Sequence, residues 1–129
     1  MAWIDLVTLL ALAEFFAFAY AVGLARARYG IKAPAVSGHE VFERYFRVQQ
    51  NTLELLILFV PALWISARYA NPVWMAAIGA VYIVGRAIYF RAYTRNPSKR
   101  TLGFGMSFVP IALLWGVASY GAVRAILGI

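Results

Sequence analysis

Residues 41–69 read VFERYFRVQQNTLELLILFVPALWISARY, and this stretch decides the fold. Its apolar run of about 13 residues is broken only by Glu54, whereas a helix that crosses a lipid bilayer needs about 20 residues. A crossing helix must therefore include the polar residues that precede the run, among them Arg47 and Asn51. The stretch predicts a membrane-spanning helix over residues 41–69 that carries charged side chains into or near the membrane.

Three more segments are long and apolar enough to cross a membrane, over residues 2–28, 73–94 and 101–127. The 129 residues are 64% hydrophobic and only 13% charged, against about 25% charged residues in a soluble domain. Because the connections are short, the sequence predicts an all-α integral membrane protein, a single four-helix up-down bundle over residues 1–129. Small residues in the last segment should let another helix approach closely: Gly103, Gly105 and Gly116.

The composition excludes several kinds of site. Cysteine is absent and His39 is the single histidine, so disulfides, thiolate metal sites and a cysteine nucleophile are excluded, and no metal is expected. The net charge of +7 comes from twelve basic and five acidic residues. These charges are sparse and flank apolar segments, so they favour topology signals and contacts with anionic lipids over nucleic-acid binding.

Lysine and arginine are concentrated in the first and third connections between the predicted helices. Loops rich in these residues stay on the cytoplasmic side of a membrane. Loops 1 and 3 are therefore predicted to be cytoplasmic, with both termini on the opposite side. The compact loops favour a bacterial inner membrane over the endoplasmic reticulum for this multi-pass protein.

A first polar row lies on the second predicted helix, where Arg47, Gln50, Asn51 and Glu54 follow at i, i+3, i+4 and i+7. This spacing places all four on one helix face. A cation, two amides and a carboxylate could bind a zwitterionic, peptide-like molecule through charge-assisted hydrogen bonds. The alternative is that Arg47 and Glu54 simply neutralise each other between helices.

A second polar row lies on the third predicted helix, where Tyr82, Arg86, Tyr89 and Tyr93 follow at i, i+4, i+7 and i+11. Arg100 continues the row beyond the turn. Tyrosines near a helix end often form an aromatic belt at the membrane interface, which is the alternative to a binding site. The arginine in the same row weakens that alternative, because it lies deeper in the segment.

Glu14 lies in the middle of the first predicted helix, where a charge costs roughly 2.5 to 3.5 kcal/mol. It could be a proton-coupled transport site or a buried partner for an arginine of another helix. The transport alternative describes a small multidrug exporter that exchanges protons for cationic drugs. The basic loops and arginine-rich rows argue against it, because they would repel such drugs.

Two stretches of the chain resemble a known family. Residues 42–54, FERYFRVQQNTLE, are similar to the signature of the MAPEG family, the membrane-associated proteins in eicosanoid and glutathione metabolism. Residues 85–93, GRAIYFRAY, followed by PSKR at residues 97–100, provide a second match. Four apolar segments in about 130 residues fit the same family. The resemblance is greatest to its microsomal glutathione transferases.

The resemblance implies a homotrimer that binds glutathione between neighbouring subunits, near the cytoplasmic side. It implies a glutathione transferase that activates the glutathione thiolate for attack on hydrophobic electrophiles in detoxification, with reduction of lipid hydroperoxides as a second activity. Arg100 corresponds to the catalytic arginine beside the glutathione sulfur. The implied glutathione contacts are Arg26, Arg47, Gln49, Asn51, Glu54, Arg86, Tyr89 and Tyr93.

Two positions depart from the leukotriene C synthase type within the family. Leu55 stands where that type has a glutathione-contacting tyrosine, and Ala27 stands where it has a second arginine on the first helix. These departures argue against the eicosanoid-epoxide reaction and leave plain conjugation or peroxide reduction less affected. A non-catalytic, lipid-binding scaffold of the same family is a further alternative, against which the retained glutathione-site pattern argues.

Overall fold

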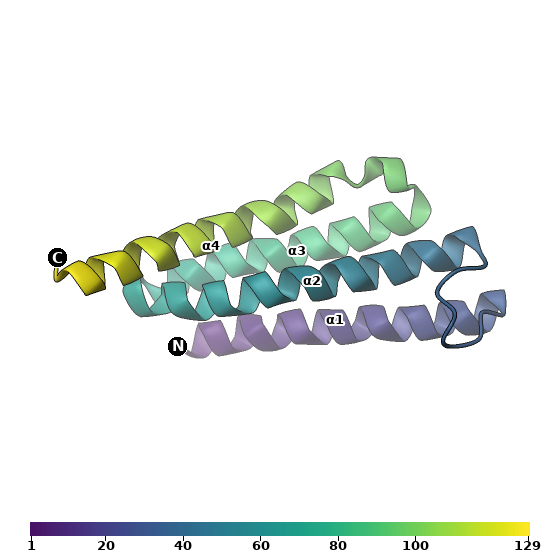
Figure 1. Cartoon of the computed structure of the whole chain (residues 1–129), viewed down its shortest axis with the longest axis horizontal. Helices are drawn as coiled ribbons and strands as arrows, with labels where there is room; N and C mark the ends of the chain where they lie inside the picture. The colour runs from purple at the N-terminus through teal and green to yellow at the C-terminus, as the bar shows by residue number, and fades with distance from the viewer.

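Four long helices, one short 3-10 turn and the connections between them make up the computed structural model, which describes residues 1–129. They run side by side in alternating directions, so that both termini lie at the same end of the bundle (Figure 1). All four are long and apolar enough to cross a membrane, which confirms the predicted four-helix bundle. The elements are α1 (Ala2–Tyr29), α2 (Glu40–Tyr69), α3 (Pro72–Arg95), η1 (Pro97–Lys99) and α4 (Thr101–Leu127).

Short polar residues set where the helices begin. The backbone N–H of Val41 donates to Nδ1 of His39 at 3.1 Å, and the N–H of Val73 donates to the side-chain oxygen of Asn71 at 2.9 Å. Both contacts satisfy backbone donors that the first turn of a helix leaves free. The histidine of the first loop is therefore a cap of α2 in this fold.

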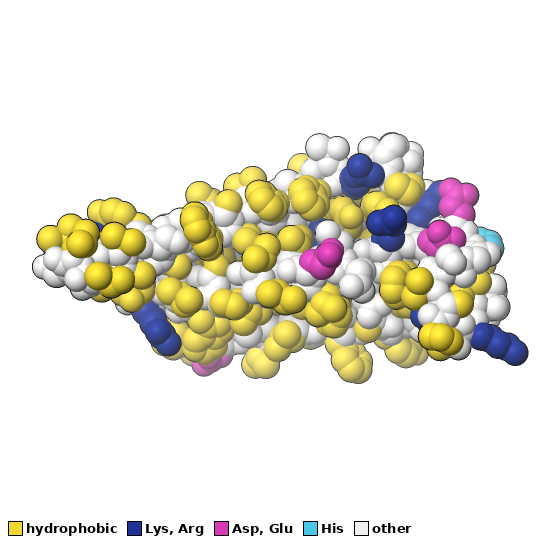
Figure 2. Space-filling view, in the orientation of Figure 1, with side chains coloured by type: hydrophobic (Ala, Val, Ile, Leu, Met, Phe, Trp, Pro, Cys, Tyr) yellow, Lys and Arg dark blue, Asp and Glu magenta, His cyan; other side chains and the backbone are white.

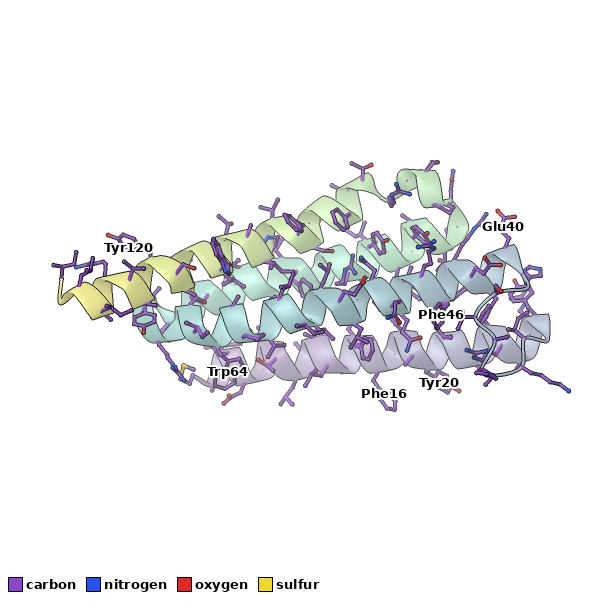
Figure 3. All side chains as sticks on the ribbon, viewed as in Figure 1. Phe16, Tyr20, Glu40, Phe46, Trp64 and Tyr120 are labelled. Carbon is purple, nitrogen blue, oxygen red and sulfur yellow. The ribbon has the colours of Figure 1, made fainter.

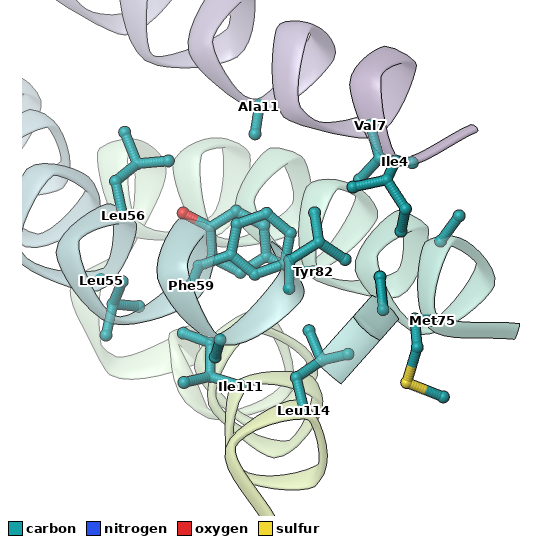
Figure 4. Packing of buried hydrophobic residues seen from close by; sticks show 14 residues of the cluster. Ile4, Val7, Ala11, Leu55, Leu56, Phe59, Met75, Tyr82, Ile111 and Leu114 are labelled. Atoms are coloured by element: carbon teal, nitrogen blue, oxygen red, sulfur yellow. The ribbon is translucent and has the colours of Figure 1, made fainter. Parts of the chain in front are cut away.

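A cluster of 14 buried apolar residues holds together the half of the bundle that contains the termini. At its centre the rings of Phe59 and Tyr82 stack with centroids 3.9 Å apart, between α1 on one side and α4 on the other (Figure 4). The half next to the first loop has smaller contacts, including the stacked rings of Phe18 and Phe90 at 4.6 Å. The main apolar core is thus separated along the helices from the end where the polar residues gather.

Glycines bring the beginning of α4 close to α3. A Cβ atom on Gly103 would lie 2.5 Å from the backbone nitrogen of Tyr89, and one on Gly85 would lie 2.6 Å from the backbone of Met106. The close approach predicted for Gly103 is therefore confirmed. No helix of the same chain approaches Gly105 or Gly116, where an added Cβ atom would meet nothing within 4 Å.

Apolar side chains cover the outside of the bundle. Phe16 and Tyr20 point away from α1 (Figure 3) and are 75% and 66% exposed. Hydrophobic side chains cover most of the length of the visible face, while most of the charged groups gather near the end that carries the first loop (Figure 2). This arrangement is typical of a bundle whose middle faces lipid and whose charged end lies at the membrane–water interface.

Candidate functional site

A polar pocket of about 680 Å³ lies toward the end of the bundle that carries the first loop. Its lining comes from the first loop, from α2, from the last turns of α3 and from the residue before α4. Figure 3 marks one of these residues, Phe46, on the first turns of α2. The lining residues are Val36, Glu43, Phe46, Arg47, Gln50, Asn51, Glu54, Tyr89, Tyr93 and Arg100.

The row predicted on α2 does face one space. Arg47, Gln50, Asn51 and Glu54 all line the pocket, as a continuous helix with their i, i+3, i+4 and i+7 spacing requires. The alternative of an Arg47–Glu54 pair is wrong, since the one salt bridge in the structure joins Arg44 and Glu40 at 2.7 Å. The charges of this row are therefore available to a ligand.

The tyrosines of the row predicted on α3 lie in two environments along the helix. Tyr82 is fully buried against Phe59 in the apolar core. Tyr89 and Tyr93 line the pocket, with stacked rings whose centroids are 5.4 Å apart. Because Tyr82 and Tyr89 are buried, an aromatic belt at the membrane surface does not describe this row.

Arg86 lies beneath the pocket and not in its lining. It is fully buried, with Nε donating to the hydroxyl of Ser107 at 2.9 Å. Its Nη1 donates to Oδ1 of Asn51 at 2.8 Å and to Oγ1 of Thr52 at 3.1 Å. Its guanidinium carbon is 4.3 Å from the ring centroid of Tyr89. In the single chain Arg86 therefore reaches the pocket through two side chains of the lining, Asn51 and Tyr89, and its implied contact with the ligand stays a prediction.

Arg26 and Gln49, two of the implied contact residues, do not line the pocket of the single chain. Nη1 of Arg26 donates to the carbonyl of Ala35 at 2.6 Å, and its guanidinium lies 5.0 Å from the ring centroid of Phe42. Arg26 thereby ties the first loop to α1. The next loop residue, Val36, lines the pocket, so this arginine shapes one wall from a distance.

Arg47 and Arg100 differ from the other arginines near the pocket. Both are exposed and line it, and neither side chain makes a hydrogen bond or salt bridge within the chain. Arginine stays protonated and can donate two parallel hydrogen bonds to an anion. The pocket thus offers two unengaged cations, together with the carboxylates of Glu43 and Glu54.

Thr52 and Ser107 were not predicted from the sequence, although they hold Arg86 in place. Each hydroxyl also donates to a backbone carbonyl of its own helix, to Val48 at 2.7 Å and to Gly103 at 2.7 Å. The sequence signal that could have identified them is a hydroxyl residue in an otherwise apolar helix. Nothing local in the sequence indicates that two such hydroxyls, from α2 and α4, meet the same arginine.

The chemistry of the lining suits a small zwitterion. Two guanidinium groups can bind carboxylates, two carboxylates can bind an ammonium group, and two amides can bind peptide groups. No group of three or more His, Cys, Asp or Glu side chains in the structure could hold a metal ion. Any reactive sulfur has to come with the ligand, because the chain contains no cysteine.

Comparison with known proteins points to one family. A model of the MAPEG family matches residues 4–120. An uncharacterized protein of Synechocystis is 42% identical over 112 residues, which are 87% of this chain and 82% of that protein. Human microsomal glutathione S-transferase 2 is 41% identical over 110 residues, 85% of this chain and 75% of the relative. The mouse protein of the same name is 41% identical over 118 residues, 88% of this chain and 80% of the relative.

Proposed function

Because the chain belongs to the MAPEG family, we propose that it is a membrane-bound glutathione transferase. In this function the protein binds glutathione in the polar pocket and joins its sulfur to apolar electrophiles that arrive through the bilayer. Relatives named microsomal glutathione S-transferase, at about 41% identity, support a transferase-like role.

The observation that carries the proposal is the pair of unengaged arginines in a pocket that also holds carboxylates and amides. Glutathione has two carboxylates, one ammonium group and two peptide bonds, so it needs each of these partners. Arg47 can bind a carboxylate, Glu54 can bind the ammonium group, and Asn51 can bind a peptide group. Tyr89 and Tyr93 form the wall beside them. In this assignment Arg86 acts from beneath the pocket.

Arg100 is proposed as the catalytic residue, because it is an unengaged cation at the beginning of α4. A free thiol has a pKa of about 8.5, so only about 3% of it is thiolate at pH 7. A neighbouring cation that lowered this pKa by about two units would make roughly three-quarters of it thiolate. The thiolate then forms a carbon–sulfur bond while the electrophile's leaving group departs with the electron pair of the bond that breaks.

An apolar groove supports the proposal that the second substrate reaches the pocket from the membrane. It has a volume of about 550 Å³ and lies between α3 and α4, with Leu102, Met106 and Val109 among its lining residues. The groove begins at Thr101, directly after the proposed catalytic arginine. A hydrophobic electrophile or a lipid hydroperoxide could therefore reach the thiolate without leaving the membrane.

The assembly and the cellular placement are proposed with the function. A homotrimer would place other subunits against the exposed apolar faces and near Arg26 and Gln49, which lie outside the pocket of the single chain. The basic loops 1 and 3 would face the cytoplasm, where glutathione is made and kept reduced. A bacterial inner membrane is the proposed location, in keeping with a cyanobacterial relative at 42% identity.

Arg100→Ala tests the function in purified protein with glutathione and chlorodinitrobenzene. Wild-type protein plus glutathione is expected to give an ultraviolet difference band of a thiolate, and the variant is expected to lose the band and most of the turnover. Arg95→Ala is the matched control, because it removes the same charge from an exposed side chain that does not line the pocket.

Unchanged turnover in Arg100→Ala would remove this residue from the catalytic role. A wild-type protein that gives neither binding heat with glutathione nor a thiolate band would instead be a non-catalytic, lipid-binding member of the family.

A further inference from the structure

The charge of Arg86 lacks a hydrogen-bonded anion. Its side chain is fully buried, and its hydrogen-bond acceptors are an amide and two hydroxyls, all of them neutral. Nη2, the remaining nitrogen of the guanidinium group, is buried without a partner in the chain. A cation inside an apolar bundle is costly unless an opposite charge lies nearby. An anion near the unpartnered Nη2 would lower this cost.

The packing of α1 against α3 places Glu14 at the level of this arginine. The side chain of Val7 fills the space beside Gly79, within 2.8 Å of a Cβ built there. The rings of Phe18 and Phe90 stack at 4.6 Å. Positions 7 and 79, and positions 18 and 90, are both 72 residues apart, so the same offset pairs residue 14 with residue 86.

Glu14 also faces inward. The buried residues of α1 recur every three to four positions, and Glu14 fills the gap in this row between Ala11 and Phe18. Its Oε1 is buried without a hydrogen-bond partner, and so is the hydroxyl of Tyr82. The 72-residue offset places Glu14 beside Arg86, and Tyr82 lies one turn before Arg86 on α3. Three neighbouring side chains, from α1 and α3, thus each present a buried atom without a partner.

We propose that Glu14 is the counter-ion of Arg86 and, through it, a positioning residue for the ligand pocket. The carboxylate balances the guanidinium charge from the α1 side. The other side of the same guanidinium holds Oδ1 of Asn51 and lies against the ring of Tyr89, both of which line the pocket. The second half of this proposal rests on the proposed function, and the first half does not.

Neutralising Glu14 should therefore weaken ligand binding without removing any atom that touches the ligand. An uncompensated Arg86 is drawn away from α1 and toward the pocket, whose lining includes the unengaged carboxylate of Glu54. Asn51 and Tyr89 then lose their fixed geometry. Because small misplacements of binding groups are costly, the KM for glutathione in Glu14→Gln should rise about tenfold. The kcat at saturating glutathione should fall much less, since Arg100 is unchanged.

The test compares Glu14→Gln with Asp5→Asn, an exposed acidic residue of the same helix. Both variants lose one negative charge from α1, and only the first is expected to change the KM for glutathione. Glu14→Asp, which keeps the charge, is expected to restore the KM most of the way toward the wild-type value. If Glu14→Gln leaves the KM unchanged, or if Asp5→Asn raises it equally, the positioning role is overturned.

A double-mutant cycle with Arg86→Gln tests the ion pair itself by thermal unfolding in detergent, without any ligand. The Arg86→Gln substitution is expected to lower the unfolding temperature less in the Glu14→Gln background than in wild type, because the doubly neutral protein has no uncompensated charge. If Glu14→Gln does not fold, recovery of folded protein in the double variant supports the pair, and failure of both overturns it. Additive effects on the unfolding temperature also overturn the ion pair.

The ion pair and the proposed function can fail separately. A wild-type protein that does not bind glutathione refutes the proposed function, while the unfolding cycle still decides whether Glu14 and Arg86 form a pair.

Discussion

At the scale of single residues, arginine side chains have three different roles in this bundle. Arg86 is buried and joins three helices through hydrogen bonds to Asn51, Thr52 and Ser107. Arg26 ties a loop to a helix through one backbone carbonyl. Arg47 and Arg100 have no partner in the chain and face the pocket. The difference lies in the surroundings, so an arginine's role follows from what its guanidinium group already contacts.

Removing the hydroxyl of Ser107 should destabilise the protein. In Ser107→Ala the Nε of Arg86 loses its acceptor at 2.9 Å in a fully buried place. A buried donor left without a partner costs about 1–3 kcal/mol, and more when it is charged. The expected result is a lower free energy of unfolding, measured by denaturant titration in detergent.

Ser66→Ala is the matched control for that measurement. Ser66 is equally buried, but its hydroxyl donates only to the carbonyl of Leu63 in its own helix. Its loss strands no charged group, so the destabilisation should be smaller. Equal losses in the two variants would contradict a special role for Ser107.

Regular spacing explains which site residues could be predicted from the sequence. Arg47, Asn51 and Glu54 share a face by helix periodicity alone, and the fold preserved that face. The surroundings of Arg86 could not be predicted in the same way, because Thr52 and Ser107 belong to other helices and their meeting depends on how α2, α3 and α4 are rotated. An ion pair between Arg47 and Glu54 was equally compatible with the spacing, and only the side-chain geometry of the structure excluded it.

At the scale of helices, the contact between α3 and α4 decides where the proposed catalytic residue lies. Gly103 is the third residue of α4, and its lack of a side chain lets α4 contact the backbone of Tyr89. Arg100 immediately precedes this helix, and Asn96 caps the short 3-10 turn before it by accepting from the N–H of Ser98 at 3.1 Å. The arginine is thus placed beside Tyr89 and Tyr93 by backbone contact.

A methyl group at Gly103 should push these helices apart. In Gly103→Ala the new carbon would lie 2.5 Å from the backbone nitrogen of Tyr89, which cannot rotate away. Overpacking of this kind costs about 1–3 kcal/mol. Both the free energy of unfolding and the turnover of chlorodinitrobenzene are expected to fall, because α4 and Arg100 move together.

Gly116→Ala provides the comparison on the same helix. Nothing lies within 4 Å of its added carbon, and alanine favours a helix over glycine by about 1 kcal/mol. This variant should keep its turnover and unfold no more easily than wild type. Loss of turnover in Gly116→Ala, or none in Gly103→Ala, would refute the argument from backbone contact.

At the scale of the whole molecule, the predicted architecture agrees with the structure. A low charge content and four long apolar segments leave few alternatives to a membrane bundle, since each helix satisfies its own backbone groups in lipid. The orientation of the bundle in the membrane remains a prediction, based on lysine and arginine in loops 1 and 3. The absence of native cysteine makes this prediction easy to test.

Single cysteines introduced at Lys32 and Ile129 should report the orientation in intact bacterial cells. Both positions are exposed, one in loop 1 and the other at the end of the chain. A maleimide that does not cross membranes is expected to label Ile129→Cys and to leave Lys32→Cys unlabelled until the cells are opened. The reverse pattern would place loop 1 outside the cytoplasm and contradict the assignment.

The lengthwise separation of the 14-residue apolar cluster from the polar pocket has a consequence for how such proteins diversify. In α2 and α3 one stretch packs in the apolar cluster and another lines the pocket, so substitutions in the pocket need not weaken the packing of the bundle. A library randomised only at Thr101, Leu102 and Gly105, the first groove residues after Arg100 and all outside that cluster, should yield many well-folded variants with altered preferences for apolar substrates. Natural substitutions at the beginning of α4 could change the apolar substrate in the same way while the bundle keeps its packing.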